Sequence, residues 1–251
     1  EGEPMSLQMM PITPVVKRLM IVTGFVWFVL QIVVGGIFNF NIWQPLALYP
    51  AQVIENFYLW QLVTYMFLHA MSPFHILFNM LMLYFFGSEL ERHWGSKFFT
   101  TYYFVTGIGA AIVYCIGVAI YSATTSIRTP LVMPVMGASG ALFGLLLAYG
   151  IIFSERVTYF MGMFPMKAKY FVLIVGGIDF ASLLSSGFAG TEVAYLAHLG
   201  GIAVGYVTLK SHAYFKLKQI ANKMKKKNTS SLRLVIDNDK NDKDDNPKYW
   251  N

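Results

Sequence analysis

Long apolar stretches separated by short polar segments run through most of this chain. Several of them approach or exceed the roughly 20 residues that a helix needs to cross the hydrocarbon core of a bilayer. In chain order they are Leu19–Phe38, Phe74–Leu90, Phe98–Tyr121, Ser139–Phe153, Tyr170–Leu184 and Val193–Leu209. The pattern predicts an all-α, polytopic membrane protein built as a bundle of six transmembrane helices.

The segment between the first two stretches, Asn39–Ser72, is neither apolar enough to span nor as polar as an ordinary loop. It mixes Pro45, Pro50 and Glu55 with several tyrosine and tryptophan side chains. Aromatic residues with one polar end favour the boundary between lipid and water. We therefore expect a structured first loop that lies in the membrane interface.

Composition agrees with this prediction and limits the other classes of function. Hydrophobic residues make up 56% of the chain and charged residues 13%. The formal net charge of +6 belongs to residues 210–251, which carry eleven basic and five acidic side chains, so a basic pI is no argument for nucleic-acid binding. We predict an N-terminal cytoplasmic segment (1–14), a membrane domain (15–209) and a basic, then acidic, partly disordered cytoplasmic tail (210–251).

The basic residues also predict an orientation. Nearly all those at the ends of the predicted spans fall on one side of the bundle, and Arg128 alone falls on the other. Since cytoplasmic loops are enriched in Lys and Arg, both termini are expected on the cytoplasmic side. The membrane is expected to be the cell (inner) membrane. The lysines at 223 and 225–227 are expected to contact anionic lipid headgroups.

A candidate for chemistry stands at the head of the fourth stretch, in the turn Gly137-Ala138-Ser139-Gly140. The first turn of a helix offers unpaired backbone N–H groups and the positive end of the helix dipole, which favour negative charge. Serine is a weak nucleophile at neutral pH and needs a base within hydrogen-bonding distance. The sequence predicts that His198 is this base.

The predicted topology places the two side chains at the same depth. Ser139 begins a helix that runs inward from the outer side, and His198 follows a helix start on that same side. Small residues spaced four apart, Gly140 and Gly144 on one helix and Ala197, Gly201 and Gly205 on the other, permit close approach of two backbones. A hydrogen bond between Ser139 and His198 is therefore expected.

The second stretch adds two polar side chains, His75 and Asn79, near its outer end. They are four residues apart and so lie on one helix face. Polar groups at membrane depth are costly in hydrocarbon and normally face the protein interior. With the backbone N–H of Ser139, they are expected to stabilise the oxyanion of a tetrahedral intermediate.

Taken together, these residues resemble the rhomboid family of intramembrane serine proteases. The matching pieces are His75-Ile-Leu-Phe-Asn79, Gly137-Ala-Ser139-Gly140, Ala197-His198-Leu-Gly-Gly201 and Glu91-Arg92 before Gly95. The resemblance covers about Val15–Leu209. It implies a Ser139–His198 catalytic dyad, an oxyanion hole with His75 and Asn79, and no cofactor or metal. The implied partners are transmembrane segments of single-pass proteins and the lipid bilayer.

Two positions depart from the family pattern. Phe143 stands where rhomboids often have a tyrosine beside the catalytic histidine, and it keeps the stacking face without the hydroxyl. Gln61 follows Trp60 where the family often shows arginine, which leaves the anchoring of the first loop open. Asp179 on the fifth stretch could orient His198 or could pair structurally, because intramembrane acids do both.

Other functions remain open from the sequence. Alone, Ser139 is more often a helix cap or a packing residue, and a lone buried histidine such as His198 is more often structural. A catalytically inactive rhomboid-like protein that binds transmembrane helices would lack the serine or the histidine, and this chain has both. A channel or transporter would use His75 and His198 as a relay, and no internal repeat of that kind is visible.

Overall fold

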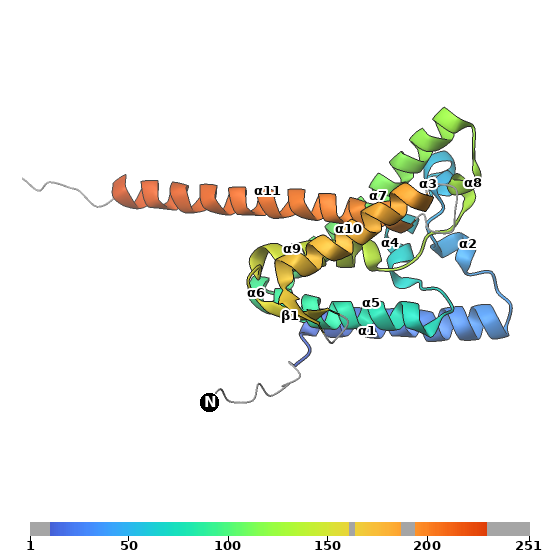
Figure 1. The fold of residues 1–251 in the computed structure, drawn as a ribbon, viewed down its shortest axis with the longest axis horizontal. Helices are drawn as coiled ribbons and strands as arrows, with labels where there is room; N and C mark the ends of the chain where they lie inside the picture. The colour runs from blue at the N-terminus through green and yellow to red at the C-terminus, as the bar shows by residue number, and fades with distance from the viewer. Residues whose placement is uncertain (1–10, 161–163, 187–193, 230–251) are drawn as a thin grey trace, which may run out of the picture. The chain divides into compact units, whose positions relative to one another are not determined.

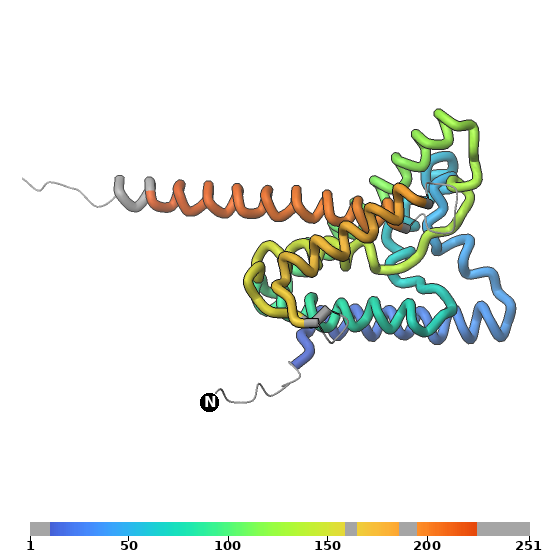
Figure 2. The backbone as a smooth tube through the Cα atoms, viewed as in Figure 1, coloured from blue at the N-terminus to red at the C-terminus, as the bar shows by residue number. Residues whose placement is uncertain are grey.

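The computed structural model describes residues 11–160, 164–186 and 194–229. Within them the chain is mostly helical, as predicted. It divides into two units, one ending at Lys210 and the other beginning at Ser211. Figure 1 shows the ribbon and Figure 2 the path of the backbone. All the candidate site residues belong to the first unit.

The first apolar helix consists of α1 (Pro14–Phe25) and a π-helical continuation, η1 (Val26–Ile37). Proline suits the first helical position, because its missing N–H would have no partner there. The next two N–H groups, of Val15 and Val16, are satisfied by the Glu91 carboxylate at 3.1 Å. This carboxylate fixes the start of the helix against α6 (Ser88–Trp94).

Four short helical elements follow in the predicted first loop. They are α2 (Trp43–Leu46), α3 (Pro50–Asn56), α4 (Gln61–Thr64) and the 3₁₀ turn η2 (Tyr65–Phe67). Gln61 is fully buried among them. Its Nε2 donates to the Gln44 carbonyl at 3.0 Å and to Gln52 Oε1 at 2.6 Å, and its Oε1 accepts from the Tyr49 N–H at 3.0 Å. The glutamine thus ties α2, α3 and α4 together, which answers the question that its departure from the family pattern raised.

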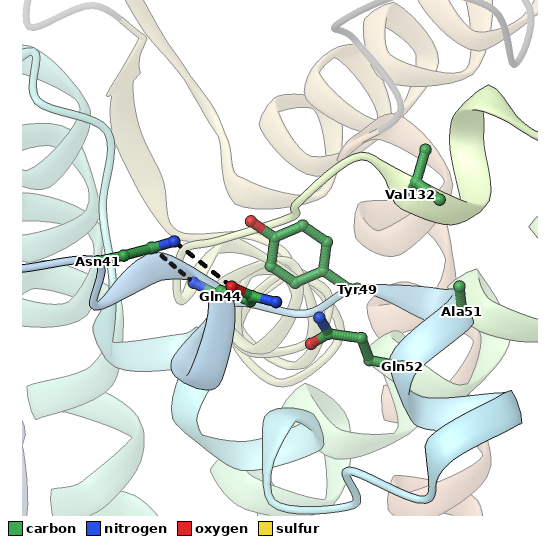
Figure 3. Close-up of a pocket in the computed structure, with 6 residues that line it drawn as sticks. All are labelled: Asn41, Gln44, Tyr49, Ala51, Gln52 and Val132. Atoms are coloured by element: carbon green, nitrogen blue, oxygen red, sulfur yellow. Dashed lines mark hydrogen bonds between the residues drawn. The ribbon is translucent and has the colours of Figure 1, made fainter.

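A cavity of about 260 Å³ opens beside this anchor. Figure 3 shows its lining, with the Tyr49 ring and Gln52 on one wall and hydrogen bonds between Asn41 and Gln44 on the other. Among the described residues that line it, none is charged. The cavity lies between the first loop and the residue Val132 of the later segment 129–132.

The second predicted stretch is one continuous run of helix, α5 (Pro73–Met82), the π-helical η3 (Leu83–Gly87) and α6. The 30-residue α7 (Ser96–Thr125) follows, and then the short α8 (Thr129–Val132). Leu48 and Val135 form an isolated antiparallel bridge, with hydrogen bonds of 3.0 and 2.9 Å. The first loop is thereby joined to the segment that leads into the serine turn.

Three further helices complete the membrane part: α9 (Ser139–Ile152), α10 (Ala168–Ser186) and α11 (Ala194–Thr229). Helix α9 packs against α7 and α10, and the ribbon in Figure 1 shows α9 and α10 adjacent. Buried tyrosines of α7, such as Tyr102, Tyr103 and Tyr114, form much of the core around it.

An antiparallel hairpin joins α9 to α10, with β1 (Val157–Phe160) paired to β2 (Phe164–Lys167). The sequence did not predict this hairpin, which is a small addition to a fold that is otherwise helical within the described residues. The pairing places Val157 opposite Lys167, which directly precedes α10. Glu155 binds Lys167 and Lys169 at 2.7 and 2.5 Å there.

Within the described residues, three helical stretches are long and apolar enough to cross a membrane: Pro14–Ile37, Ser96–Thr125 and Ala168–Ser185. Helix α9 is apolar but shorter. The count of six crossings stays a prediction. Helix α11 continues 20 residues past Leu209, where the sequence predicted the last span to end, and residues Ser211–Thr229 of the second unit are helical. The predicted cap at Ser185–Thr191 lies outside the described residues beyond Ser186.

Candidate active site

The serine turn is held by the first loop and shaped by a glycine. The Gly137 N–H donates to the Tyr65 carbonyl at 2.9 Å, and Gly137 has φ +120°, a conformation that L side chains rarely adopt. Ser139 then begins α9 as its first residue and is half-buried. The N–H groups of this first turn have no acceptor within the helix.

His198 of α11 meets this serine across 59 positions of sequence. Its Nε2 lies 2.7 Å from Ser139 Oγ. This is a normal hydrogen-bond length for a hydroxyl and an imidazole. The two side chains that the sequence predicts to lie at one depth are therefore in direct contact.

Small residues bring the two helices together. A Cβ at Gly201 would overlap the backbone of Gly140, and one at Gly205 would lie 3.1 Å from Gly144 Cα. The Gly144 carbonyl also accepts a hydrogen bond from Tyr102 Oη at 2.8 Å. Backbone contact between α9 and α11, with no side chain between them, sets the distance from the serine to the histidine.

Two further side chains hold the imidazole of His198. The Phe143 ring stacks on it, with centroids 4.2 Å apart and planes at 9°. Asp179 of α10 places Oδ2 2.6 Å from His198 Nδ1, and the two side chains are 11% and 15% exposed. Both ring nitrogens of His198 thus have a partner, and one face of the ring is covered.

His75 of α5 faces the same turn. Its Nδ1 accepts the Ala70 N–H at 3.2 Å, so the neutral ring carries its proton on Nε2. A Cβ built on Gly137 would lie 3.2 Å from this Nε2 and 3.8 Å from Ser139 Oγ. The N–H donor of His75 and the serine oxygen therefore approach the same point, which a side chain at position 137 would fill.

Asn79 lies one turn further along α5 and is 5% exposed. Its Nδ2 donates to the His75 carbonyl at 2.8 Å, which engages one of its two amide hydrogens. The buried His69 ring lies against that of His75, with centroids 5.2 Å apart. Burial, followed by the nearby His75, lowers the pKa of His69 to about 4, so this loop histidine is neutral at physiological pH.

Gln31 of η1 fastens the loop that carries His69. Its Nε2 donates to the His69 carbonyl at 2.5 Å, and its Oε1 accepts the His69 N–H at 2.8 Å. Sequence reasoning missed this contact, although a single glutamine in an otherwise apolar span is a signal that could have found it.

In the described part of the chain, no three His, Cys, Asp or Glu side chains gather where they could hold a metal ion.

The structure thus brings together Ser139, His198 and His75, with Asn79 hydrogen-bonded to the backbone of His75. Sequence reasoning left Asp179 open, and the structure places its carboxylate on His198. His93 of α6 lies apart from these residues, against Phe153 at the opposite end of α9.

Comparison with known proteins gives a consistent result. A sequence family described as Rhomboid domain matches residues 56–213, more than half of the chain. RHOMBOID-like protein 12, mitochondrial, of Arabidopsis thaliana is 31% identical over 53% of this chain and 40% of its own length. Putative rhomboid protease YdcA of Bacillus subtilis is 31% identical over 59% of this chain and 64% of its own.

Rhomboid protease GlpG of Haemophilus influenzae is 25% identical over 63% of this chain and 72% of its own length. The first curated relatives are matched over less than two thirds of their own lengths. Two of the three relatives described are named proteases, while the Arabidopsis protein is named only for its likeness to the family.

Proposed function

Because this chain belongs to the rhomboid family, we propose that it is an intramembrane serine endopeptidase. Its substrates would be other membrane proteins, cut in or near a transmembrane segment. The observation that carries the proposal is the 2.7 Å contact between Ser139 Oγ and His198 Nε2. A hydroxyl and a base in hydrogen-bond contact are the minimum machinery of acyl transfer.

The first half of the reaction forms an acyl-enzyme. His198 Nε2 takes the hydroxyl proton as Ser139 Oγ attacks the peptide carbonyl, which becomes a tetrahedral oxyanion. His75 Nε2–H, the Asn79 amide and the Ser139 backbone N–H donate hydrogen bonds to that oxygen. His198 then gives its proton to the leaving amine, and the carbon–nitrogen bond breaks.

The second half needs water. His198 removes a proton from a water molecule that attacks the ester carbon, and then returns a proton to Ser139 Oγ as the acid product leaves. Preorganised donors such as the His75 N–H contribute most where charge develops, since they need no reorganisation during the reaction. The tautomer of His75, fixed by the Ala70 N–H, suits it to donate rather than accept.

A helical substrate hides its carbonyl groups in intrahelical hydrogen bonds, so the segment to be cut must unwind first. We therefore expect preference for segments that contain Gly, Pro or other weak helix formers. Ser139 stands at the predicted outer end of α9, so cleavage is expected near the outer side of a cell membrane. Both termini of the protein would then lie in the cytoplasm.

A fluorophosphonate probe tests the proposal, because it reacts only with an activated serine. The purified protein is expected to be labelled at Ser139, and Ser139→Ala and His198→Ala should abolish labelling. Ser122→Ala is the matched control, since Ser122 is buried in α7 and its Oγ makes no hydrogen bond within the described residues. This control should label as the wild type does.

Incubation with a panel of transmembrane segments, followed by mass spectrometry, then maps the cut. If the wild-type protein bound these segments but neither cut them nor reacted with the probe, the helix-binding alternative would be favoured. Histidine-dependent ion flux in liposomes without labelling would favour the channel.

A further inference from the structure

The acid of the site comes from a third helix. Asp179 lies in α10, whereas the serine and the histidine lie in α9 and α11. It is buried, and its Oδ2 is 2.6 Å from His198 Nδ1. Several side chains of α10 are large, apolar and exposed, as at Leu173, Ile178 and Phe180.

A buried carboxylate in such a helix is expensive unless it has a partner. Among the described residues, the titratable and polar groups that face the imidazole of His198 are Asp179, Ser139, His75 and, edge-on at 6.4 Å, Tyr195. Among these only Asp179 carries a negative charge. The acid and the imidazole are therefore each other's natural partners.

We propose that Asp179 is a positioning residue that completes a Ser139–His198–Asp179 triad. This inference rests on the proposed function and deepens it. The carboxylate accepts the Nδ1–H of His198, which leaves the lone pair of Nε2 directed at the Ser139 hydroxyl. When Nε2 takes the serine proton, the same carboxylate stabilises the imidazolium that forms.

Phe143 cannot replace this function. Stacking at 9° fixes the plane of the imidazole, but a phenyl face offers no acceptor that distinguishes Nδ1–H from Nε2–H. The wrong tautomer would present an N–H to Ser139 Oγ, and the serine would keep its proton. Selection of the tautomer therefore depends on Asp179.

Three variants test the inference: Asp179→Asn, Asp179→Glu and the control Ser185→Ala, which removes an exposed hydroxyl from the same helix. An asparagine keeps the shape but can donate to Nδ1 and select the wrong tautomer. We expect Asp179→Asn to lower kcat and the rate of fluorophosphonate labelling by about 10²- to 10⁴-fold. KM should change little, because the carboxylate does not touch substrate. The control should match the wild type.

Asp179→Glu retains the charge and should recover at least tenfold of the activity that asparagine loses. A carboxylate that served only to pack α10 would show the reverse order, because asparagine is closer in size. Melting temperature measured in detergent separates the two explanations. Equal melting temperatures for Asp179→Asn and wild type, with a large difference in kcat, are expected.

Proton NMR of protein with ¹⁵N-labelled histidine gives a reading that does not depend on activity. An Nδ1–H donated to a carboxylate is strongly deshielded, so one downfield imidazole signal is expected in the wild type. It should vanish in His198→Ala and in Asp179→Asn and persist in Ser139→Ala.

Labelling of Asp179→Asn within threefold of the wild-type rate, or persistence of the downfield signal in that variant, would overturn the inference and leave the proposed function intact. Absence of labelling in the wild type would instead remove the proposed function. If the downfield signal were still present in that case, the contact between Asp179 and His198 would be a structural ion pair only. The catalytic inference would then fail together with the proposed function.

Discussion

Helices α9 and α10 are both apolar, yet they occupy opposite environments. In α9 ten of the 14 residues are buried, whereas only 11% of the spanning window of α10 is buried. The candidate nucleophile sits on the enclosed helix and its acid partner on the exposed one. The difference shows that apolar composition alone does not tell an enclosed helix from an exposed one.

The largest effect is expected from one methyl group added at the contact between α9 and α11. Gly201→Ala would press a Cβ into the backbone of Gly140, so α11 must move away from α9. We expect labelling of Ser139 to fall by at least 100-fold and the protein to lose roughly 1–3 kcal/mol of stability or more. Thermal unfolding in detergent and the labelling rate measure both.

Gly177→Ala is the matched change on α10, where a new Cβ would meet nothing within 4 Å. It should keep full activity and gain up to about 1 kcal/mol from the better helix propensity of alanine. Equal losses in the two variants would mean that the contact between α9 and α11 is no more closely packed than the open face of α10.

The stability of the protein should depend on pH through the buried side chain of His69. The pKa of His69 falls to about 4 in the folded loop, from an ordinary value near 6.5. Between these values the unfolded chain binds a proton that the folded loop rejects, so stability is complete above pH 6.5 and declines as the pH falls toward 4. The loss is about 3 kcal/mol.

His69→Gln should flatten that decline in melting temperature between pH 7 and pH 4, measured against the wild type in the same detergent. An unchanged slope in the variant would assign the decline to other groups.

Removing the aromatic face beside His198 should have a smaller effect. Phe143→Ala loses a stacked pair worth about 0.5–1.5 kcal/mol, and the freed imidazole samples other orientations. We expect the labelling rate to drop roughly 2- to 10-fold. Leu173→Ala on the exposed face of α10 serves as the control and should leave the rate unchanged.

The smallest effect is expected at the hairpin. Hydrogen bonds from Lys167 and Lys169 lower the pKa of Glu155 to about 2, yet the carboxylate is exposed and screened. Glu155→Gln should leave the melting temperature and the labelling rate within error, because exposed ion pairs contribute little to stability. A clear loss of activity would show that the hairpin helps to place α10.

Much of the fold is readable from hydropathy because long apolar runs have one solution in lipid. The predicted stretches Phe98–Tyr121, Ser139–Phe153 and Tyr170–Leu184 agree with α7, α9 and α10 to within a few residues. The hairpin was missed because two four-residue strands give too short a pattern. The end of α11 was missed because apolar character stops near Leu209, while good helix formers such as Lys, Leu and Gln continue.

The site divides in the same way. Small residues and topology suffice to predict that Ser139 and His198 meet, since both follow helix starts on one side; their catalytic roles stay a prediction. The contact of Asp179 with His198 depends on the rotation of α10 about its own axis, which tertiary packing fixes. The role of Gln61 as an anchor could not be predicted, because it depends on three hydrogen-bond partners in separate turns. They are the Gln44 carbonyl, the Tyr49 N–H and the Gln52 side chain.

The glycine contact between α9 and α11 has one last consequence. Where two helices touch main chain to main chain, their spacing cannot be adjusted by rotamer changes, and thermal motion of side chains does not alter it. The separation of Ser139 Oγ and His198 Nε2 should then vary little with temperature or with the thickness of the surrounding lipid, until the helix pair itself comes apart.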